Sequence, residues 1–115
     1  MTLKLSAFNP APENWSPDDD PDAVFEIVAL PGLQIAVFND LYAAGRPLEA
    51  ARHLILAGVK SISGVTDADG KEITNARELW KAMQGADMTA AALMGILTVK
   101  IVAKSALTKA DAKNL

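Results

Sequence analysis

The sequence MTAAALMGILTVKIV, residues 88–102, decides the fold class of this chain. Leu93, Leu97 and Ile101 recur every four residues, a spacing that places all three on one face of an α-helix. Four further apolar residues widen this stripe around the helix: Met94, Ile96, Val99 and Val102. A helix that is apolar over most of its circumference must be packed on more than one side. We therefore expect it to lie inside the domain or partly against another chain.

This stretch is too short to be read as a membrane span. Its uncharged run, residues 88–99, has 12 residues and is followed by Lys100, whereas crossing a bilayer takes about 20. The N-terminal sequence MTLKLSAFNP has no apolar stretch of the length that a signal peptide needs before Asn9 and Pro10. The sequence thus predicts a core helix, no membrane partner and a cytoplasmic protein.

Two shorter helices are expected as a hairpin before this stretch. Leu33, Val37 and Leu41 recur every four residues, and Gly45 follows as a C-terminal cap. Pro47 suits the first turn of a second helix, which Gly58 ends. The short link between the two helices favours antiparallel packing.

Further helix starts are predicted by capping residues. Asn75, with Glu78 three residues later, resembles a capping box and opens a helix that stops near Gly85. Asp87 can cap the long apolar helix, and Thr108 a last short turn.

Two segments indicate a small β element. Residues 23–30 are rich in β-branched and aromatic side chains and end at Pro31-Gly32. Residues 62–73 read as a small β-hairpin or an irregular loop around an Asp-Gly turn. The Asp67-x-Asp69-Gly70 cluster does not fit a calcium loop, whose first and twelfth positions would fall on Val65 and Ala76. The prediction is a mainly helical α+β fold: four or five helices with a small β-hairpin or a two-to-three-stranded sheet.

The first 22 residues are expected to form an extended or mobile arm. Four of the six prolines and the Asp18-Asp19-Asp20 run fall here, so residues 1–22 are assigned to the arm and residues 23–115 to a single helical domain. The arm is either a solvated acidic segment or a contact to a basic partner or a neighbouring subunit. In the second case Trp15 is its anchor.

The composition excludes most site chemistry. The chain has no cysteine and one histidine, His53, which removes thiolate catalysis and most zinc sites. Its seven glycines form no phosphate-binding motif, and no two acids are placed in one pocket. A net charge of −3 repels nucleic acid. We therefore expect no enzyme activity, no cofactor, no metal and no nucleic-acid partner.

The order of the segments resembles that of the tail assembly chaperones of long-tailed, siphovirus-like bacteriophages. The resemblance covers about residues 24–115 and rests on layout, length and five sequence features. These are Leu30-Pro31-Gly32, the helix pair containing GRPLEAARHL (45–54), Gly64-Val65-Thr66-Asp67, Ser105-Ala106-Leu107-Thr108 and Lys113-Asn114.

The resemblance implies a non-enzymatic role in virion assembly. The chain would bind the tape measure protein and, through a longer form made by ribosomal frameshifting, assist the tail tube protein. It would act in the cytoplasm of the bacterial host and be absent from the mature virion. The alternative is a small structural virion protein, at the head-tail joint or in tail completion, that forms an oligomeric ring.

Excess apolarity locates the expected protein contact on the long helix. Met83, Met88 and Met94 cluster near the last two helices, where flexible thioethers suit either core packing or a surface for varied apolar partners. The predicted protein-binding residues, for the partner or for self-association, are Met88, Met94, Leu97, Ile101 and Trp15.

Overall fold

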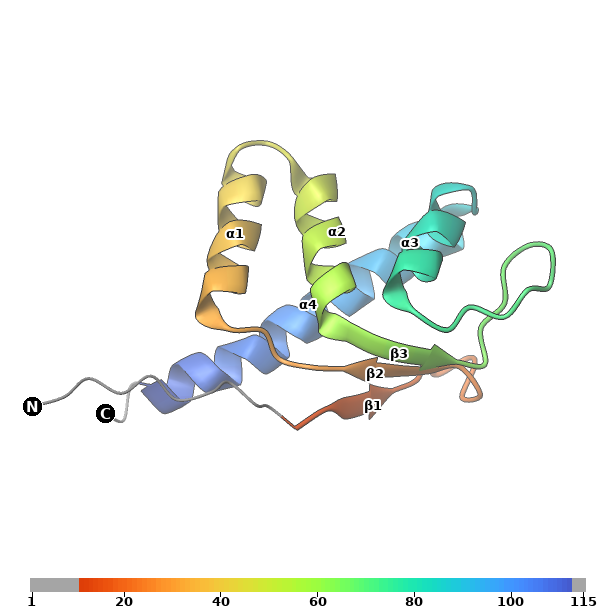
Figure 1. Cartoon of the computed structure of the whole chain (residues 1–115), viewed down its shortest axis with the longest axis horizontal. Coiled ribbons are helices and arrows are strands. Elements are labelled where there is room, and N and C mark those ends of the chain that lie inside the picture. Colours follow the sequence, from red (N-terminus) through yellow and green to blue (C-terminus); the bar gives the residue numbers. More distant parts are fainter. Residues whose placement is uncertain (1–10, 113–115) are drawn as a thin grey trace, which may run out of the picture.

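The computed structural model describes residues 11–112, with side chains up to residue 105, and forms these residues into four helices and one three-stranded sheet (Figure 1). The mainly helical α+β class is thereby confirmed. The elements in chain order are β1 (Glu13–Trp15), β2 (Val24–Ile27), α1 (Gly32–Ala43), α2 (Pro47–Gly58), β3 (Val59–Ser63), α3 (Ala76–Gln84) and α4 (Met88–Ala112).

The sheet is antiparallel throughout, in the order β1, β2, β3. Its central strand, β2, is the predicted strand of residues 23–30, shortened to four residues. Phe25 and Ile27 are two positions apart on β2, so their side chains point to the same face of the sheet, where both are buried in the core. β3 follows α2 directly and adds Val59 and Ile62 to that core. One face of the sheet therefore supplies the lower wall of the hydrophobic interior.

β1 lies inside the segment that the sequence assigned to an arm. It pairs with β2, with Trp15 opposite Phe25, and the two rings lie 5.6 Å apart. β1 therefore adds residues 13–15 of the predicted arm to the sheet. A three-residue strand between prolines is too short to carry an alternating pattern. Residues 1–10 of the predicted arm lie outside the described residues.

α1 and α2 form the predicted hairpin. Gly45 makes the turn with a φ of 77°, which side chains other than glycine rarely adopt, and Pro47 begins α2. The two helices differ in burial, because α2 turns Leu54 and Ile55 into the core whereas α1 has no buried residue. Leu33, near the start of α1, is 83% exposed.

α3 begins at the predicted capping box. The Oδ1 of Asn75 accepts a hydrogen bond of 2.9 Å from the backbone N–H of Glu78, and its Nδ2 donates to the Glu78 carboxylate at 3.0 Å. In the preceding loop, the Oδ1 of Asp67 accepts from the backbone N–H groups of Asp69 and Lys71, both at 2.9 Å. These bonds confirm the prediction of a turn at this Asp-Gly sequence.

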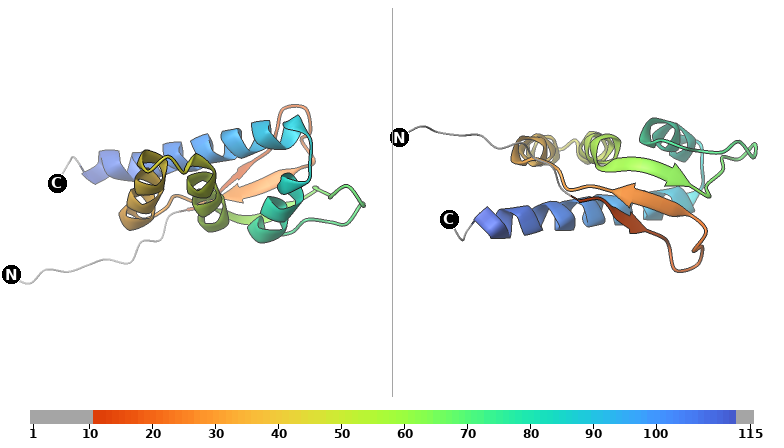
Figure 2. Two further views of the ribbon diagram at one scale, coloured as in Figure 1. Left: turned by 90° about the horizontal axis from the view of Figure 1, so that it is seen from above. Right: turned by 60° about the horizontal axis from the view of Figure 1, so that its bottom comes forward.

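α4 runs along the length of the molecule and contacts each of the other three helices (Figure 2). It approaches α2 closely at Gly58, where an added Cβ atom would lie 2.8 Å from side-chain carbons of Ile101. The helix continues unbroken to Ala112, so the predicted separate last turn capped by Thr108 is wrong. α4 thus links the helices to the strand layer along one side of the domain.

Over Met88–Ser105, α4 is long and apolar enough to cross a membrane, by length and composition alone. The length of the uncharged run alone, which ends before Lys100, predicts instead that this stretch is too short for a membrane span. A single helix of this kind is weak evidence for a membrane, since the core helix of a soluble protein passes the same test. Its inner face packs against α2, and its Leu97 and Ile101 belong to the same hydrophobic core as Phe25 of β2, which makes α4 part of this domain.

Candidate protein-binding site

An apolar hollow of about 630 Å³ lies where α2, α3 and α4 meet. We call it the methionine hollow, because three of its ten lining residues are methionines. The lining residues are Leu48, Trp80, Met83, Gln84, Ala86, Asp87, Met88, Ala90, Ala91 and Met94. Asp87 is the one formally charged residue among them, so the hollow offers an apolar partner mainly dispersion contacts.

The hollow is built by the tight connection between α3 and α4. α3 ends at Gln84 with Gly85 as its C-cap, and the carboxylate of Asp87 accepts a hydrogen bond of 2.9 Å from the backbone N–H of Thr89. This cap starts α4 shortly after α3, so Met83 near the end of α3 and Met88 at the start of α4 line the same hollow. Met88 is 83% exposed, whereas Met83 is half-buried against the core.

Leu48 and Trp80 complete the walls of the hollow. Leu48, in the first turn of α2, is 60% exposed, and Trp80 of α3 is 8% exposed. The hollow therefore has a rigid aromatic floor and a rim of flexible or exposed apolar side chains. Such a rim adapts to partners of different shape.

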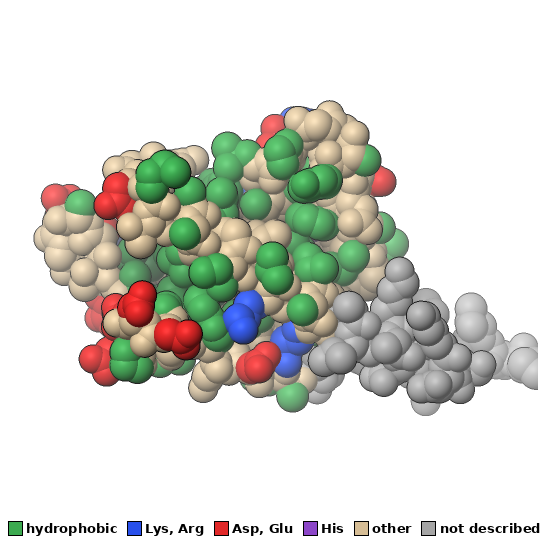
Figure 3. Space-filling view, turned by 180° about the vertical axis from the view of Figure 1, so that it is seen from behind, with side chains coloured by type: hydrophobic (Ala, Val, Ile, Leu, Met, Phe, Trp, Pro, Cys, Tyr) green, Lys and Arg blue, Asp and Glu red, His purple; other side chains and the backbone are tan. Residues whose placement is uncertain are grey.

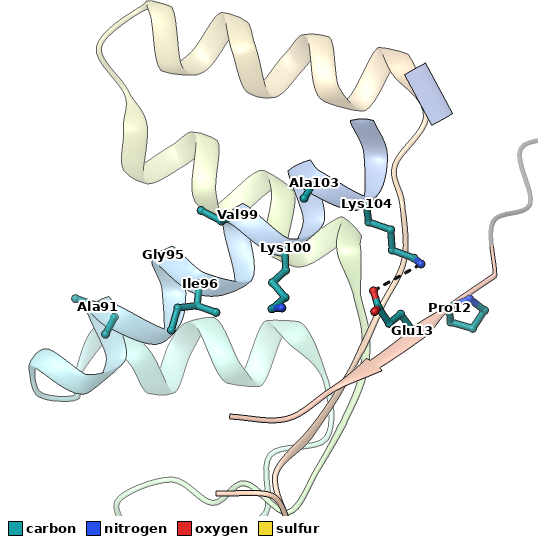
Figure 4. Close-up of a pocket in the computed structure, with 10 residues that line it drawn as sticks. Pro12, Glu13, Ala91, Gly95, Ile96, Val99, Lys100, Ala103 and Lys104 are labelled. Atoms are coloured by element: carbon teal, nitrogen blue, oxygen red, sulfur yellow. Dashed lines mark ion pairs between the residues drawn. The ribbon is translucent and has the colours of Figure 1, made fainter. Parts of the chain in front are cut away.

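A second hollow of about 1070 Å³ runs along the outer side of α4 beside β1 (Figure 4). Its apolar wall is formed by Ala91, Ala92, Gly95, Ile96, Val99 and Ala103, and its far rim by Pro12 and Glu13. The Nζ of Lys104 lies 3.8 Å from the Glu13 carboxylate, and Lys100 lies over the Trp15 ring. The space-filling view shows hydrophobic side chains spread over this side of the molecule (Figure 3).

The predicted binding residues are divided between two environments. Met88 and Met94 both line the methionine hollow. Leu97 and Ile101 have no exposed surface and belong to the core, so their assignment to a partner contact is corrected. The larger side chains of α4 at this spacing face the domain interior, and smaller ones occupy much of its outer side.

Trp15 does not anchor an exposed arm. It is half-buried, packs against Phe25 and carries the ammonium group of Lys100 at 5.6 Å from its ring centroid. It lines neither hollow. Its partners within the chain explain why an aromatic residue stands in an acidic, proline-rich segment.

Sequence reasoning missed Leu48 and Trp80 in the methionine hollow. Met83 was noticed through the clustering of methionines, but Leu48 lies about 35 residues earlier and gave no such signal. It also missed Val99, which widens the apolar stripe of α4 yet is 67% exposed. Apolar residues on most sides of a helix do not reveal which side the domain covers.

Within the described residues, the polar side chains form no evident metal or catalytic site. No group of three or more histidine, aspartate or glutamate side chains there is placed to hold a metal ion. The Nε2 atom of His53 is buried and makes no hydrogen bond. Asp67 uses its carboxylate to close its own turn.

No protein-family model matches the chain, and neither a curated protein nor a solved structure matches it.

Proposed function

We propose that this protein is a non-enzymatic tail assembly chaperone of a long-tailed bacteriophage, which binds an apolar helical segment of the tape measure protein. The observation that carries the proposal is the methionine hollow, an open apolar surface built from three helices. The layout of the sequence, which resembles this class of chaperone, supplies the identity of the partner.

The hollow fits a helix better than it fits a small polar substrate. Trp80 supplies a broad apolar floor, and Met88 and Leu48 stand at the rim with most of their surface exposed. An amphipathic helix lays its apolar side chains into such a groove and keeps its polar side in water. Unbranched methionine side chains can adjust to each successive turn of a long partner.

The proposal includes where and with what the protein acts. Its partners are the tape measure protein and, through a longer frameshifted form, the tail tube protein. It acts in the cytoplasm of the bacterial host and is absent from the mature virion. No catalytic group, cofactor, nucleic acid or membrane takes part.

The test is co-expression of the chain with the DNA that follows it and with the long helical protein encoded nearby. Copurification of that protein, together with a longer product seen by mass spectrometry, is the expected result. Leu48→Asp should abolish copurification, because a carboxylate at the rim cannot be desolvated by an apolar helix.

Leu33→Asp is the matched control. Both leucines are exposed and stand second in their helices, where an acidic side chain suits the helix dipole and leaves folding intact. Leu33 lies on α1, outside the methionine hollow, so this variant should still capture the partner. Loss of capture by both variants, or by neither, contradicts the assignment of the site.

The alternative, a structural virion protein that forms a ring, is favoured by a different observation. A ring needs two different patches on each subunit. The exposed apolar side of α1, with Leu33 and Val37, is separate from the methionine hollow. Finding the chain in purified particles, without a copurifying tape measure protein, would favour this alternative and reject the chaperone.

A further inference from the structure

The outer side of α4 is an apolar helix face that no other element of the described chain covers. We call it the outer α4 face and define it by Ala92, Gly95, Ile96, Val99 and Ala103. Val99 is 67% exposed and Ile96 is 44% exposed. Ala92, Gly95 and Val99 follow one another at intervals of three and four residues, the spacing at which one helix packs along another.

The charges beside this face are unequal at its two ends. The turn between β1 and β2 carries four exposed acids, Asp18, Asp19, Asp20 and Asp22. It lies at the end of the molecule where α4 begins (Figures 1 and 2). Lys100 and Lys104 lie toward the other end of the face, on the side of β1. The acidic and basic side chains are visible along one edge of the hydrophobic surface (Figure 3).

We propose that the outer α4 face binds a second copy of this chain, with the two α4 helices antiparallel. A two-fold axis then relates the outer α4 faces of the two copies. The axis passes near Gly95 and Ile96, midway between Met88 and Ala103. The antiparallel arrangement sets the lysines of each copy beside the acidic turn of the other. A parallel arrangement would set acids beside acids and lysines beside lysines, which costs free energy.

The side chains of the face suit this arrangement. A centre between Gly95 and Ile96 puts Val99 of one copy opposite Ala92 of the other, so a larger side chain meets a smaller one. The absence of a side chain at Gly95 lets the two backbones come close. The hollow beside β1 takes up the side chains at the margin of the incoming helix.

This inference does not depend on the proposed chaperone role. The dimer uses the outer α4 face and the acidic turn, whereas the tape measure contact is assigned to the methionine hollow, which adjoins that face at Ala91 and Met88. Self-association is measured on the purified chain alone, so its failure leaves the partner experiment unaffected.

The first test is the molecular mass of the full chain in solution, measured by sedimentation equilibrium. We expect about 24 kDa, twice the 12.1 kDa of one chain. Val99→Asp should give 12 kDa with an unchanged helical circular dichroism spectrum. Val37→Asp, at an exposed valine in the middle of α1, is the matched control and should leave the dimer intact. A monomeric wild type, or a dimer lost only in Val37→Asp, overturns the proposal.

The second test is the relative orientation of the two α4 helices, measured by disulfide cross-linking. The chain has no native cysteine, so only the introduced cysteines can react. Ile96→Cys lies next to the axis and should form a disulfide with its own copy on oxidation. Met88→Cys should not cross-link alone, but should do so when mixed with Ala103→Cys. Cross-linking of Met88→Cys with itself would indicate parallel helices and overturn the antiparallel arrangement.

The third test is charge. Lys100→Glu should weaken the dimer at least tenfold at low salt, because it sets a carboxylate beside the acidic turn of the other copy. Adding Asp19→Lys and Asp20→Lys to Lys100→Glu should restore the dimer. Failure of this restoration, with a dimer otherwise present, contradicts the charge pairing.

Discussion

The backbone N–H of Leu30 donates a buried hydrogen bond of 2.9 Å to the Oγ of Ser105, 75 positions later in the chain. The same hydroxyl donates to the carbonyl oxygen of Ile101 at 2.7 Å. One small side chain on α4 thereby satisfies a backbone group of the segment that leaves β2. The bond ties the last part of α4 to the strand layer, where the sequence predicted nothing specific.

Ser105→Ala should lower the free energy of unfolding by about 1–3 kcal/mol, because the N–H of Leu30 would be left buried without an acceptor. Thr98→Ala is the control on the same helix. The Thr98 hydroxyl bonds only to the carbonyl oxygen of Met94, at 2.8 Å, so its removal should cost less than about 0.5 kcal/mol. Urea denaturation measures both values, and equal losses would contradict the role of Ser105.

Leu97→Ala should cost about 2–5 kcal/mol, because Leu97 is fully buried and its removal leaves a cavity. Val99→Ala, two positions away on the exposed side, should change the stability by less than about 0.5 kcal/mol in the monomer. Chemical denaturation at a concentration where both variants are monomeric compares them. If Leu97→Ala lowered the free energy of unfolding only slightly, Leu97 would not be a core residue, and its predicted role in a protein contact would stand again.

The helices and strands of this fold could be predicted from the sequence better than which face of each helix is buried. The N-cap Asn75 and the first-turn Pro47 act on the adjacent backbone, so the starts of their helices could be predicted from the local sequence. Which side of α4 is covered depends on Gly58 and Ser105, whose contacts join segments far apart in the chain. The methionine hollow escaped prediction for the same reason, since Leu48 reaches it only through the packing of α2 against α3 and α4.

Gly64→Ala should abolish folding or lower the stability by more than about 3 kcal/mol. Gly64 has a φ of 73°, and an added Cβ would overlap the carbonyl group of Asp22. Gly70→Ala separates these two effects, because Gly70 has a φ of 83° but no atom near the position of a Cβ. It should cost only about 1–2 kcal/mol. Thermal unfolding of both variants tests this, and equal shifts in Tm would show that backbone conformation alone matters.

Trp15→Ala should lower the stability by about 2 kcal/mol, because Trp15 covers Phe25 from the edge strand. Asn14→Ala, at an exposed position of the same strand, should cost less than about 0.5 kcal/mol. Urea denaturation checks both. If Trp15→Ala behaves like Asn14→Ala, then β1 does not contribute to the domain and the original boundary at residue 23 is the better one.

The lack of any buried residue in α1 has a consequence for hydrogen exchange. Ile35 and Phe38 of α1 are only partly buried against the core, so detachment of α1 would expose less apolar surface than unfolding of the whole domain and should require less free energy. Amide protons of α1 should therefore exchange with solvent deuterium well before those of Leu54 and Ile55 in α2. The chain would behave as two cooperative units of unequal stability, with the weaker unit at one end of the molecule.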